Sequence, residues 1–150
     1  MPIRLLRHAE SHEGDGVGID CGLTEEGKRQ ASRLSGHYDL LVLSPMKRCL
    51  ETVYCSKIKA NRTISSDLVR EYRISGCDFL DDEPMVCETE DELVARVDRF
   101  KALLKEYSEE FNTILVVSHA DFIWYLTKKD IGEGNMVGKC TQHCEIIGYL

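Results

Sequence analysis

The stretch Asn112-Thr113-Ile114-Leu115-Val116-Val117-Ser118 carries the clearest strand signal in this sequence of 150 residues. Its unbroken apolar run, rich in β-branched side chains, is typical of a strand that is buried on both faces of a sheet. His119 follows directly, and a helix is predicted from about Asp121 to Lys128. A buried strand, a polar residue and a helix in this order indicate the repeating unit of an α/β fold.

Weaker signals of the same kind extend this pattern toward both ends of the chain. Further strands are predicted over 3–6, 38–43, 63–65 and 145–149, and residues 12–22 read as a glycine-rich loop. Strands that alternate with helices imply a mostly parallel sheet with helices on both faces. The sequence therefore predicts a three-layer α/β/α sandwich, with residues 1–150 forming one domain.

The predicted helices begin at residues that favour helix N-termini. Thr24 is followed by two glutamates, Ser44 is followed by proline at the first helical position, and Thr89-x-x-Glu92 is a capping box. The helices are accordingly expected over 25–35, closed by Gly36, over 45–56, and from residue 90 onward.

Composition excludes several classes of protein. The net charge of −7 and the pI near 5.2 disfavour binding to nucleic acid or to anionic membranes, which depends on clustered basic residues. No apolar run approaches the roughly 20 residues that span a bilayer. The N-terminus lacks the apolar stretch of a signal peptide, so a cytoplasmic location is expected, with all seven cysteines as reduced thiols. No metal or cofactor is predicted, because Cys140-x-x-x-Cys144 has no partner pair of cysteines.

Polar residues follow three of the predicted strands. Arg7-His8 comes after the first strand, Ser44 with Arg48 one helical turn further on comes after the second, and Ser118-His119 ends the central strand. Parallel strands present their carboxyl ends at one edge of a sheet, where ligands bind in such folds. Two guanidinium groups and two imidazoles at that edge suit a phosphoryl group, and a neutral histidine can attack phosphorus.

Four motifs in the same order resemble the histidine phosphatase superfamily, also called phosphoglycerate mutase-like. The first is Arg7-His8-Ala9-Glu10-Ser11 after a strand, and the second is Asp20-x-x-Leu23-Thr24-x-x-Gly27-x-x-Gln30-Ala31. Leu43-Ser44-Pro45-Met46-Lys47-Arg48 with Glu51-Thr52 is the third, and Val116-Val117-Ser118-His119-Ala120 is the last. The resemblance covers both ends of the chain and implies the phosphoglycerate mutase-like fold.

The resemblance also implies roles for particular residues. His8 is expected to be the phosphorylated nucleophile, and the phosphate pocket is expected to contain Arg7, Arg48 and His119, with Ser11 as a further substrate-binding residue. Glu71, in Val69-Arg70-Glu71, best matches the mid-chain proton donor of the family. Nearby carboxyl groups stay open for that role: Asp78, Asp81, Asp82, Glu83 and Asp121.

Three functions follow from these roles. The compact length favours a phosphatase that hydrolyses phosphomonoesters or protein phosphohistidine through a phosphohistidine intermediate on His8. The alternatives are a mutase-like phosphotransferase and a catalytically weak phosphate-binding adaptor with the same fold. The expected partner is a phosphorylated small molecule or phosphoprotein, and specificity is expected to come from the loops at 12–22 and 72–88.

The acidity of the chain is confined to one segment. Residues 67–92 contain ten acidic and two basic residues, a net charge of −8, whereas the rest of the chain has a net charge of +1. If this segment borders the cleft, it should favour small or basic phosphorylated partners over polyanions. The average charge of the protein therefore does not argue against an anionic substrate.

Overall fold

The computed structural model describes residues 2–15 and 18–149, and residues 16–17 of the predicted glycine-rich loop lie outside this description. The elements in chain order are β1 (Ile3–Arg7), the 3₁₀ turn η1 (His12–Asp15), α1 (Glu25–Ser32), β2 (Ser35–Leu43), α2 (Lys47–Cys55), β3 (Lys57–Ser65), the 3₁₀ turns η2 (Asp67–Val69) and η3 (Gly76–Asp78), α3 (Glu90–Glu110), β4 (Ile114–Ser118), α4 (Ala120–Thr127), β5 (Lys129–Asp130), β6 (Met136–Val137) and β7 (Ile146–Tyr149). None of the described helices combines the length and the apolar character that crossing a bilayer requires.

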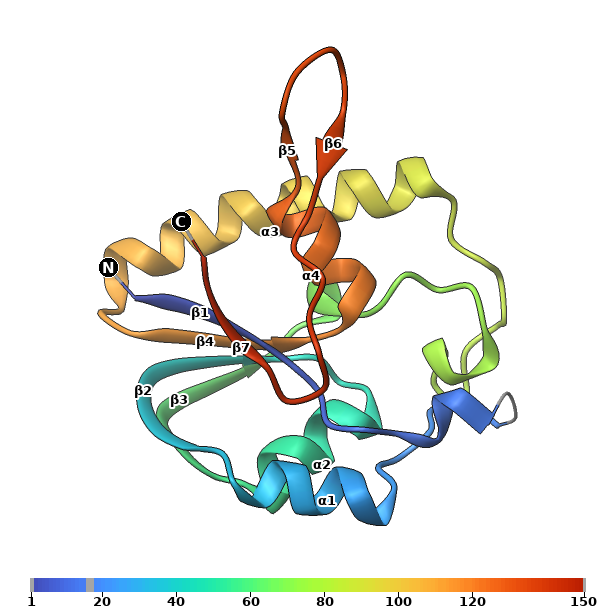
Figure 1. Cartoon of the computed structure of the whole chain (residues 1–150), viewed down its shortest axis with the longest axis vertical. Helices are drawn as coiled ribbons and strands as arrows, with labels where there is room; N and C mark the ends of the chain where they lie inside the picture. Colours follow the sequence, from blue (N-terminus) through green and yellow to red (C-terminus); the bar gives the residue numbers. More distant parts are fainter. Residues whose placement is uncertain (1, 16–17, 150) are drawn as a thin grey trace.

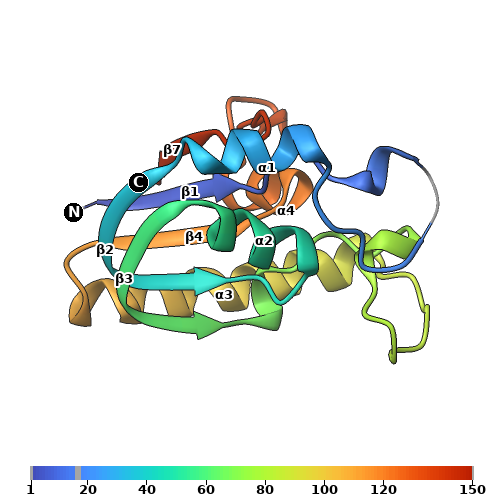
Figure 2. The same ribbon diagram turned by 90° about the horizontal axis from the view of Figure 1, so that it is seen from below.

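Five strands form one sheet in the order β3-β2-β4-β1-β7. The first four are parallel to one another, and β7 pairs with β1 in the antiparallel direction. Figure 1 shows α3 and α4 on one face of this sheet and α1 and α2 on the other, and the view from below in Figure 2 shows α1 and α2 from their outer side. The predicted three-layer sandwich with a mostly parallel sheet is confirmed.

The two faces of the sheet bury alternate residues of the same strands. Leu5, Val42 and Val116 pack with apolar residues of α3 and α4, whereas Leu6, Leu43 and Val117 pack on the opposite side with Cys49 of α2. All five residues of β4 are buried. This alternation follows from the two-residue period of a strand, and it explains why the central strand reads as an unbroken apolar run.

Two helix boundaries differ from the predicted ones. Helix α1 ends at Ser32, and Gly36 lies inside β2 rather than closing the helix, with a positive φ of 139°. Helix α2 begins at Lys47 rather than at Pro45, and the Ser44 hydroxyl, which accepts the Met46 amide at 3.4 Å, also contacts His119 Nε2 at 2.8 Å.

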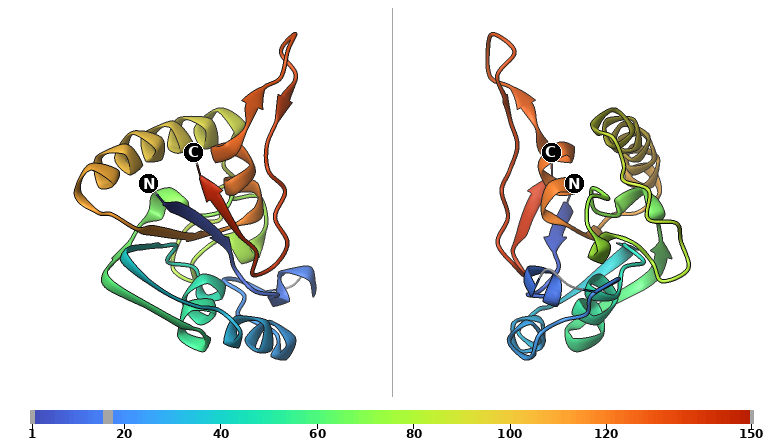
Figure 3. Two further views of the ribbon diagram at one scale, coloured as in Figure 1. Left: turned by 60° about the vertical axis from the view of Figure 1, so that its left-hand side comes forward. Right: turned by 90° about the vertical axis from the view of Figure 1, so that its right-hand side faces the viewer.

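The other differences concern strands. Strand β3 is nine residues long although only its last three residues were readable as a strand, because most of its side chains face solvent. The hairpin of β5 and β6 has no alternating pattern that predicts it, and it projects from the end of α4 (Figure 3).

The prediction that all seven cysteines are reduced is wrong for one pair. Cys21 and Cys77 form a disulfide with their Cα atoms 5.2 Å apart, and Cys49, Cys55, Cys87, Cys140 and Cys144 are free. The partners are 56 residues apart in sequence, so no spacing rule could pair them. The disulfide joins the loop before α1 to the 3₁₀ turn η3.

Candidate active site

The carboxyl ends of β1, β2 and β4 meet at one edge of the sheet and bring the predicted site residues together. The His8 amide donates to the Ser118 carbonyl at 3.1 Å, and the Ser44 amide donates to the Val117 carbonyl at 3.1 Å. These bonds hold the residues that follow the three strands side by side. The ring centroids of His8 and His119 lie 5.2 Å apart.

His8 is buried and its ring is held in one tautomer. We assign the ring proton to Nδ1, because the Ala9 carbonyl 2.7 Å away can only accept a hydrogen bond. Nε2 then carries the lone pair, which accepts a hydrogen bond from Arg48 Nε at 3.3 Å. Burial, reinforced by the charges of Arg48 and Arg7, holds the pKa of His8 well below its usual range. The imidazole is therefore neutral at physiological pH, and Nε2 is its unprotonated nitrogen.

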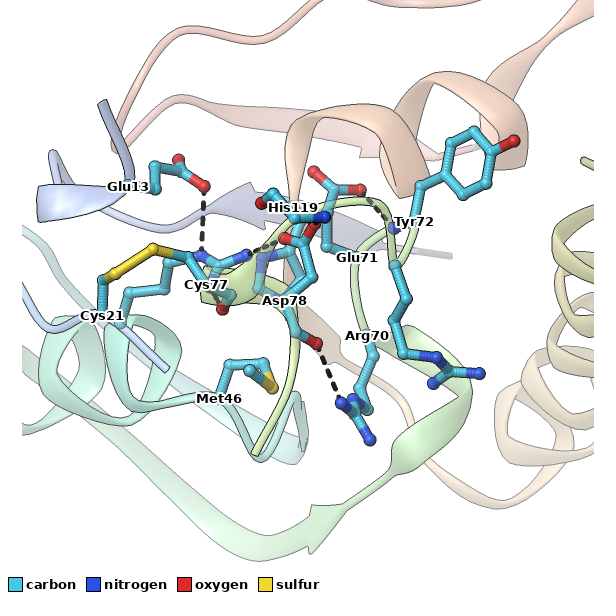
Figure 4. A network of polar contacts seen from close by, with 12 residues as sticks. Glu13, Cys21, Met46, Arg70, Glu71, Tyr72, Cys77, Asp78 and His119 are labelled. Atoms are coloured by element: carbon cyan, nitrogen blue, oxygen red, sulfur yellow. Dashed lines mark hydrogen bonds and ion pairs between the residues drawn. A yellow bond between two sulfur atoms is a disulfide. The ribbon is translucent and has the colours of Figure 1, made fainter. Parts of the chain in front are cut away.

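The Arg48 side chain is fully buried and its guanidinium is fixed from several sides. Nη1 donates to the Cys77 carbonyl at 2.7 Å, and Nη2 donates to Asp78 Oδ1 at 3.1 Å. The other oxygen of Asp78 accepts hydrogen bonds from the amides of Ile74 and Ser75 and from the Ser75 hydroxyl. Figure 4 shows Cys77 and Asp78 together in this network. The acidic segment thus borders the site and orients its guanidinium.

His119 lies beside His8 at the N-terminus of α4. Its Nε2 atom is 2.8 Å from the Ser44 hydroxyl and 3.5 Å from Cys49 Sγ, whose own pKa is raised to about 12 by burial. The Ser44 oxygen also accepts the Met46 amide, and we assign the Ser44 hydroxyl proton to the bond with His119 Nε2, which places the ring proton on Nδ1. Among the described residues, the buried Nδ1 atom has no hydrogen-bond partner. Burial, together with the charges of Arg48 and His8, keeps the pKa of His119 well below its usual range.

Arg7 is held by a segment far away in sequence. Its Nη1 atom donates to the Thr141 carbonyl at 2.8 Å, and its buried Nε atom has no hydrogen-bond partner within the described part of the chain. Three buried side-chain nitrogens of the described residues lack acceptors, Nε of Arg7, Nε of Arg70 and Nδ1 of His119, and such atoms are uncommon in folded proteins. They are expected where a ligand supplies the acceptors.

Glu71 is the buried carboxyl group next to this cluster. Oε1 accepts the amides of Tyr72 and Phe122 at 2.9 and 3.0 Å, and Oε2 accepts the Asp121 amide at 3.2 Å, so the side chain caps α4 (Figure 4). Burial, helped by the charge of Asp121, raises the pKa of Glu71 to about 7, although the amide hydrogen bonds oppose this shift. A carboxyl group that titrates near neutral pH can both donate and accept a proton.

The other carboxyl groups considered for proton donation are less suitable or differently engaged. Asp78 forms an ion pair with Arg48, Glu83 forms an ion pair with Arg70, and Asp81 and Asp82 are exposed. Burial raises the pKa of Asp121, which remains the second candidate beside Glu71.

Ser11 is buried and holds the turn that follows the first motif. Its Oγ atom accepts the Glu13 amide at 3.4 Å, and its backbone forms a bridge with Leu23. A role of Ser11 in binding substrate stays a prediction.

Two site residues had no readable signal in the sequence. Glu13 places one carboxylate oxygen 3.5 Å from His8 Nε2 and the other 3.5 Å from Arg48 Nε. The His143 ring lies 5.8 Å from that of His8, because the antiparallel strand β7 leads its preceding loop back to the end of β1. The Cys144 amide fixes this loop by donating to the carbonyls of Arg7 and His8.

One group of side chains among the described residues has the composition of a metal site. His8, Glu13 and His143 offer ligand atoms within 4.8 Å of one another. However, Arg48 Nε donates to the same His8 nitrogen that a metal would need, and the guanidinium charge opposes a cation there. The arrangement therefore favours an anion over a metal ion.

Comparison with known proteins agrees with this geometry. Residues 3–78 match the model of the histidine phosphatase superfamily, branch 1. The chain belongs to this superfamily. A search of curated protein sequences gives no match.

Solved structures show the same fold at low sequence identity. A phosphoglycerate mutase from Thermus thermophilus aligns with a TM-score of 0.66 and 19% identity over 99% of this chain and 92% of its own. An alpha-ribazole phosphatase from Shigella flexneri aligns with a TM-score of 0.62 and 19% identity over 93% of this chain and 95% of its own. The predicted phosphoglycerate mutase-like fold is confirmed by these alignments.

Proposed function

We propose that this protein is a phosphatase that hydrolyses phosphorylated small molecules or protein phosphohistidine through a covalent intermediate on His8. The observation that carries the proposal is the pair of contacts made by the His8 ring: Nδ1 lies 2.7 Å from the Ala9 carbonyl and Nε2 lies 3.3 Å from Arg48 Nε, which assigns the lone pair to Nε2. A nucleophile that is neutral, oriented and next to a cation is what attack on a phosphate ester requires.

In the first step, the Nε2 lone pair forms a bond to phosphorus while the bond from phosphorus to the leaving oxygen breaks. The protonated Glu71 gives its proton to that oxygen, so the alcohol leaves uncharged. Arg7 and Arg48 hold the phosphoryl oxygens, and the unpartnered Nδ1–H of His119 and Nε–H of Arg7 supply the remaining donors.

In the second step, water attacks the phosphoryl group and the bond between phosphorus and Nε2 breaks. The Glu71 carboxylate accepts a proton from that water, which restores the acid for the next cycle. Because the pKa of Glu71 is about 7, the same group serves as acid and then as base without a large penalty in either direction.

Hydrolysis of p-nitrophenyl phosphate tests the nucleophile. The wild-type chain should turn over, and His8→Ala should lose at least about a thousandfold in kcat. His37→Ala is the matched control, because His37 is exposed near the opposite end of β2. Equal rates in wild type and His8→Ala would remove His8 from this role.

Two further measurements separate the alternative functions. A labelled phosphoryl group that is stable in base and lost in acid, and that is absent from His8→Ala, identifies the intermediate. Conversion of 3-phosphoglycerate to 2-phosphoglycerate in the presence of a bisphosphate primer would instead indicate a mutase. Phosphate binding without any turnover of aryl esters would indicate the adaptor.

A further inference from the structure

The Glu13 carboxylate lies beside both the proposed nucleophile and the arginine that the proposed reaction uses. One oxygen is 3.5 Å from His8 Nε2, and the other is 3.5 Å from Arg48 Nε. A phosphoryl group bound for attack needs one atom in line with Nε2 and oxygens beside the Arg48 guanidinium. Glu13 thus occupies the position that these atoms would take.

The two carboxylates that contact Arg48 differ in how firmly they are held. Asp78 is 5% exposed at its side chain and has hydrogen bonds at both oxygens, whereas the Glu13 side chain is 29% exposed. Glu13 belongs to the short turn η1, and its contacts to His8 and Arg48 are both at 3.5 Å. Glu13 can therefore be displaced, and Asp78 cannot be displaced without breaking the turn around it.

The charge of Glu13 lowers the affinity of the site for an anion. Asp78 already balances the charge of the Arg48 guanidinium, so the Glu13 carboxylate balances the charge of Arg7 and leaves this group of four side chains with no net charge. A phosphate dianion that enters must displace one carboxylate and then remain close to it. The energy of binding phosphate is reduced by both effects.

We propose that Glu13 weakens the binding of free phosphate, because its carboxylate competes with the phosphoryl group for the space beside His8 Nε2 and for the Arg48 guanidinium. The inference rests on the proposed function, because it requires the phosphoryl group to bind at His8. Weaker binding of inorganic phosphate promotes release of the product. A phosphate ester makes further contacts through its leaving group, whereas inorganic phosphate has no such group.

Isothermal titration calorimetry with inorganic phosphate tests this inference without any turnover. Glu13→Gln and Glu13→Ala should each bind phosphate with a Kd at least about tenfold lower than that of the wild type, which corresponds to about 1.4 kcal/mol. Glu25→Gln changes the net charge by the same amount at a side chain that is 81% exposed in α1, and its Kd should equal that of the wild type. The melting temperature of each variant checks that it is folded.

The results separate the two proposals. A Kd that falls in both Glu13 variants and not in Glu25→Gln supports the competition. A Kd that is unchanged or higher in both Glu13 variants overturns it, even if the wild type hydrolyses p-nitrophenyl phosphate normally. Absence of turnover that depends on His8, with a Kd that still falls, would reject the proposed hydrolysis and leave the competition for phosphate in place.

Discussion

The protonation of Glu71 should control hydrolysis of esters with poor leaving groups. With a pKa of about 7, half of the molecules carry the proton at pH 7, roughly a tenth at pH 8 and roughly a hundredth at pH 9. The rate for an ester that needs this proton should therefore fall about fivefold from pH 7 to 8 and about tenfold from pH 8 to 9. Protonation of His8 should not change the rate near pH 6.5, because the pKa of His8 is well below that value.

Replacing the carboxyl group gives the matching perturbation. Glu71→Gln cannot donate a proton, so hydrolysis of phenyl phosphate, whose leaving phenol resembles the tyrosine side chain with a pKa near 10, should slow by about 10²- to 10⁴-fold. Hydrolysis of p-nitrophenyl phosphate should slow far less, because nitrophenolate leaves without a proton. The decline above pH 7 should disappear in the variant.

The assay is kcat/KM for both esters between pH 5 and 9, in wild type, Glu71→Gln and the exposed control Glu25→Gln. Glu71 also caps α4, so a purely structural defect is expected to slow both esters equally. Equal slowing of both esters, or a pH profile of wild type that stays flat to pH 9, would refute the role of Glu71 and direct attention to Asp121.

Three further predictions concern stability, each measured by chemical or thermal unfolding. Reduction of the disulfide between Cys21 and Cys77 should lower the unfolding free energy by about 4 kcal/mol, because the closed loop spans 56 residues, whereas Cys140→Ser should change little. Gly27→Ala should destabilise the fold by about 1–3 kcal/mol, because its Cβ would lie 2.0 Å from the Glu10 carbonyl, and Gly148→Ala, with nothing within 4 Å, is the control. Phe100→Ala should cost about 3–5 kcal/mol, because this ring is fully buried between α3 and the sheet. Equal unfolding free energies would contradict each prediction: for the reduced and oxidised protein, for Gly27→Ala and Gly148→Ala, and for Phe100→Ala and the wild type.

Most of the fold could be predicted because its signals are local. The apolar run before His119 indicates a strand buried on both faces, and Thr89 with Glu92 forms the capping box that opens α3. Strand β3 was readable only in part, since its exposed side chains give no apolar pattern. The sequence predicts that α2 begins at Pro45 because Ser44 resembles an N-cap, whereas the helix begins at Lys47 and the Ser44 hydroxyl contacts both the Met46 amide and His119.

The residues that follow strands could also be predicted as one cluster. His8, Arg48 and His119 come together because parallel strands end at a common edge, a rule that needs no coordinates. Glu71 was predicted as the proton donor from its motif alone, and the structure adds that its side chain is buried and that burial raises its pKa to about 7.

The contacts that tune the site depend on segments that are distant in sequence. Glu13 reaches His8 from a loop, Asp78 reaches Arg48 across 30 residues, and His143 arrives through the antiparallel strand β7. Neither hydrophobic periodicity nor helix-capping residues predict these contacts, because the contacts depend on how loops close over the sheet and not on the conformation of a single segment. The amino-acid pattern therefore specified most of the sheet, the edge at which the site lies and the residue proposed as nucleophile. The folded chain alone showed that the Glu13 carboxylate lies against His8 and that Cys21 and Cys77 are joined.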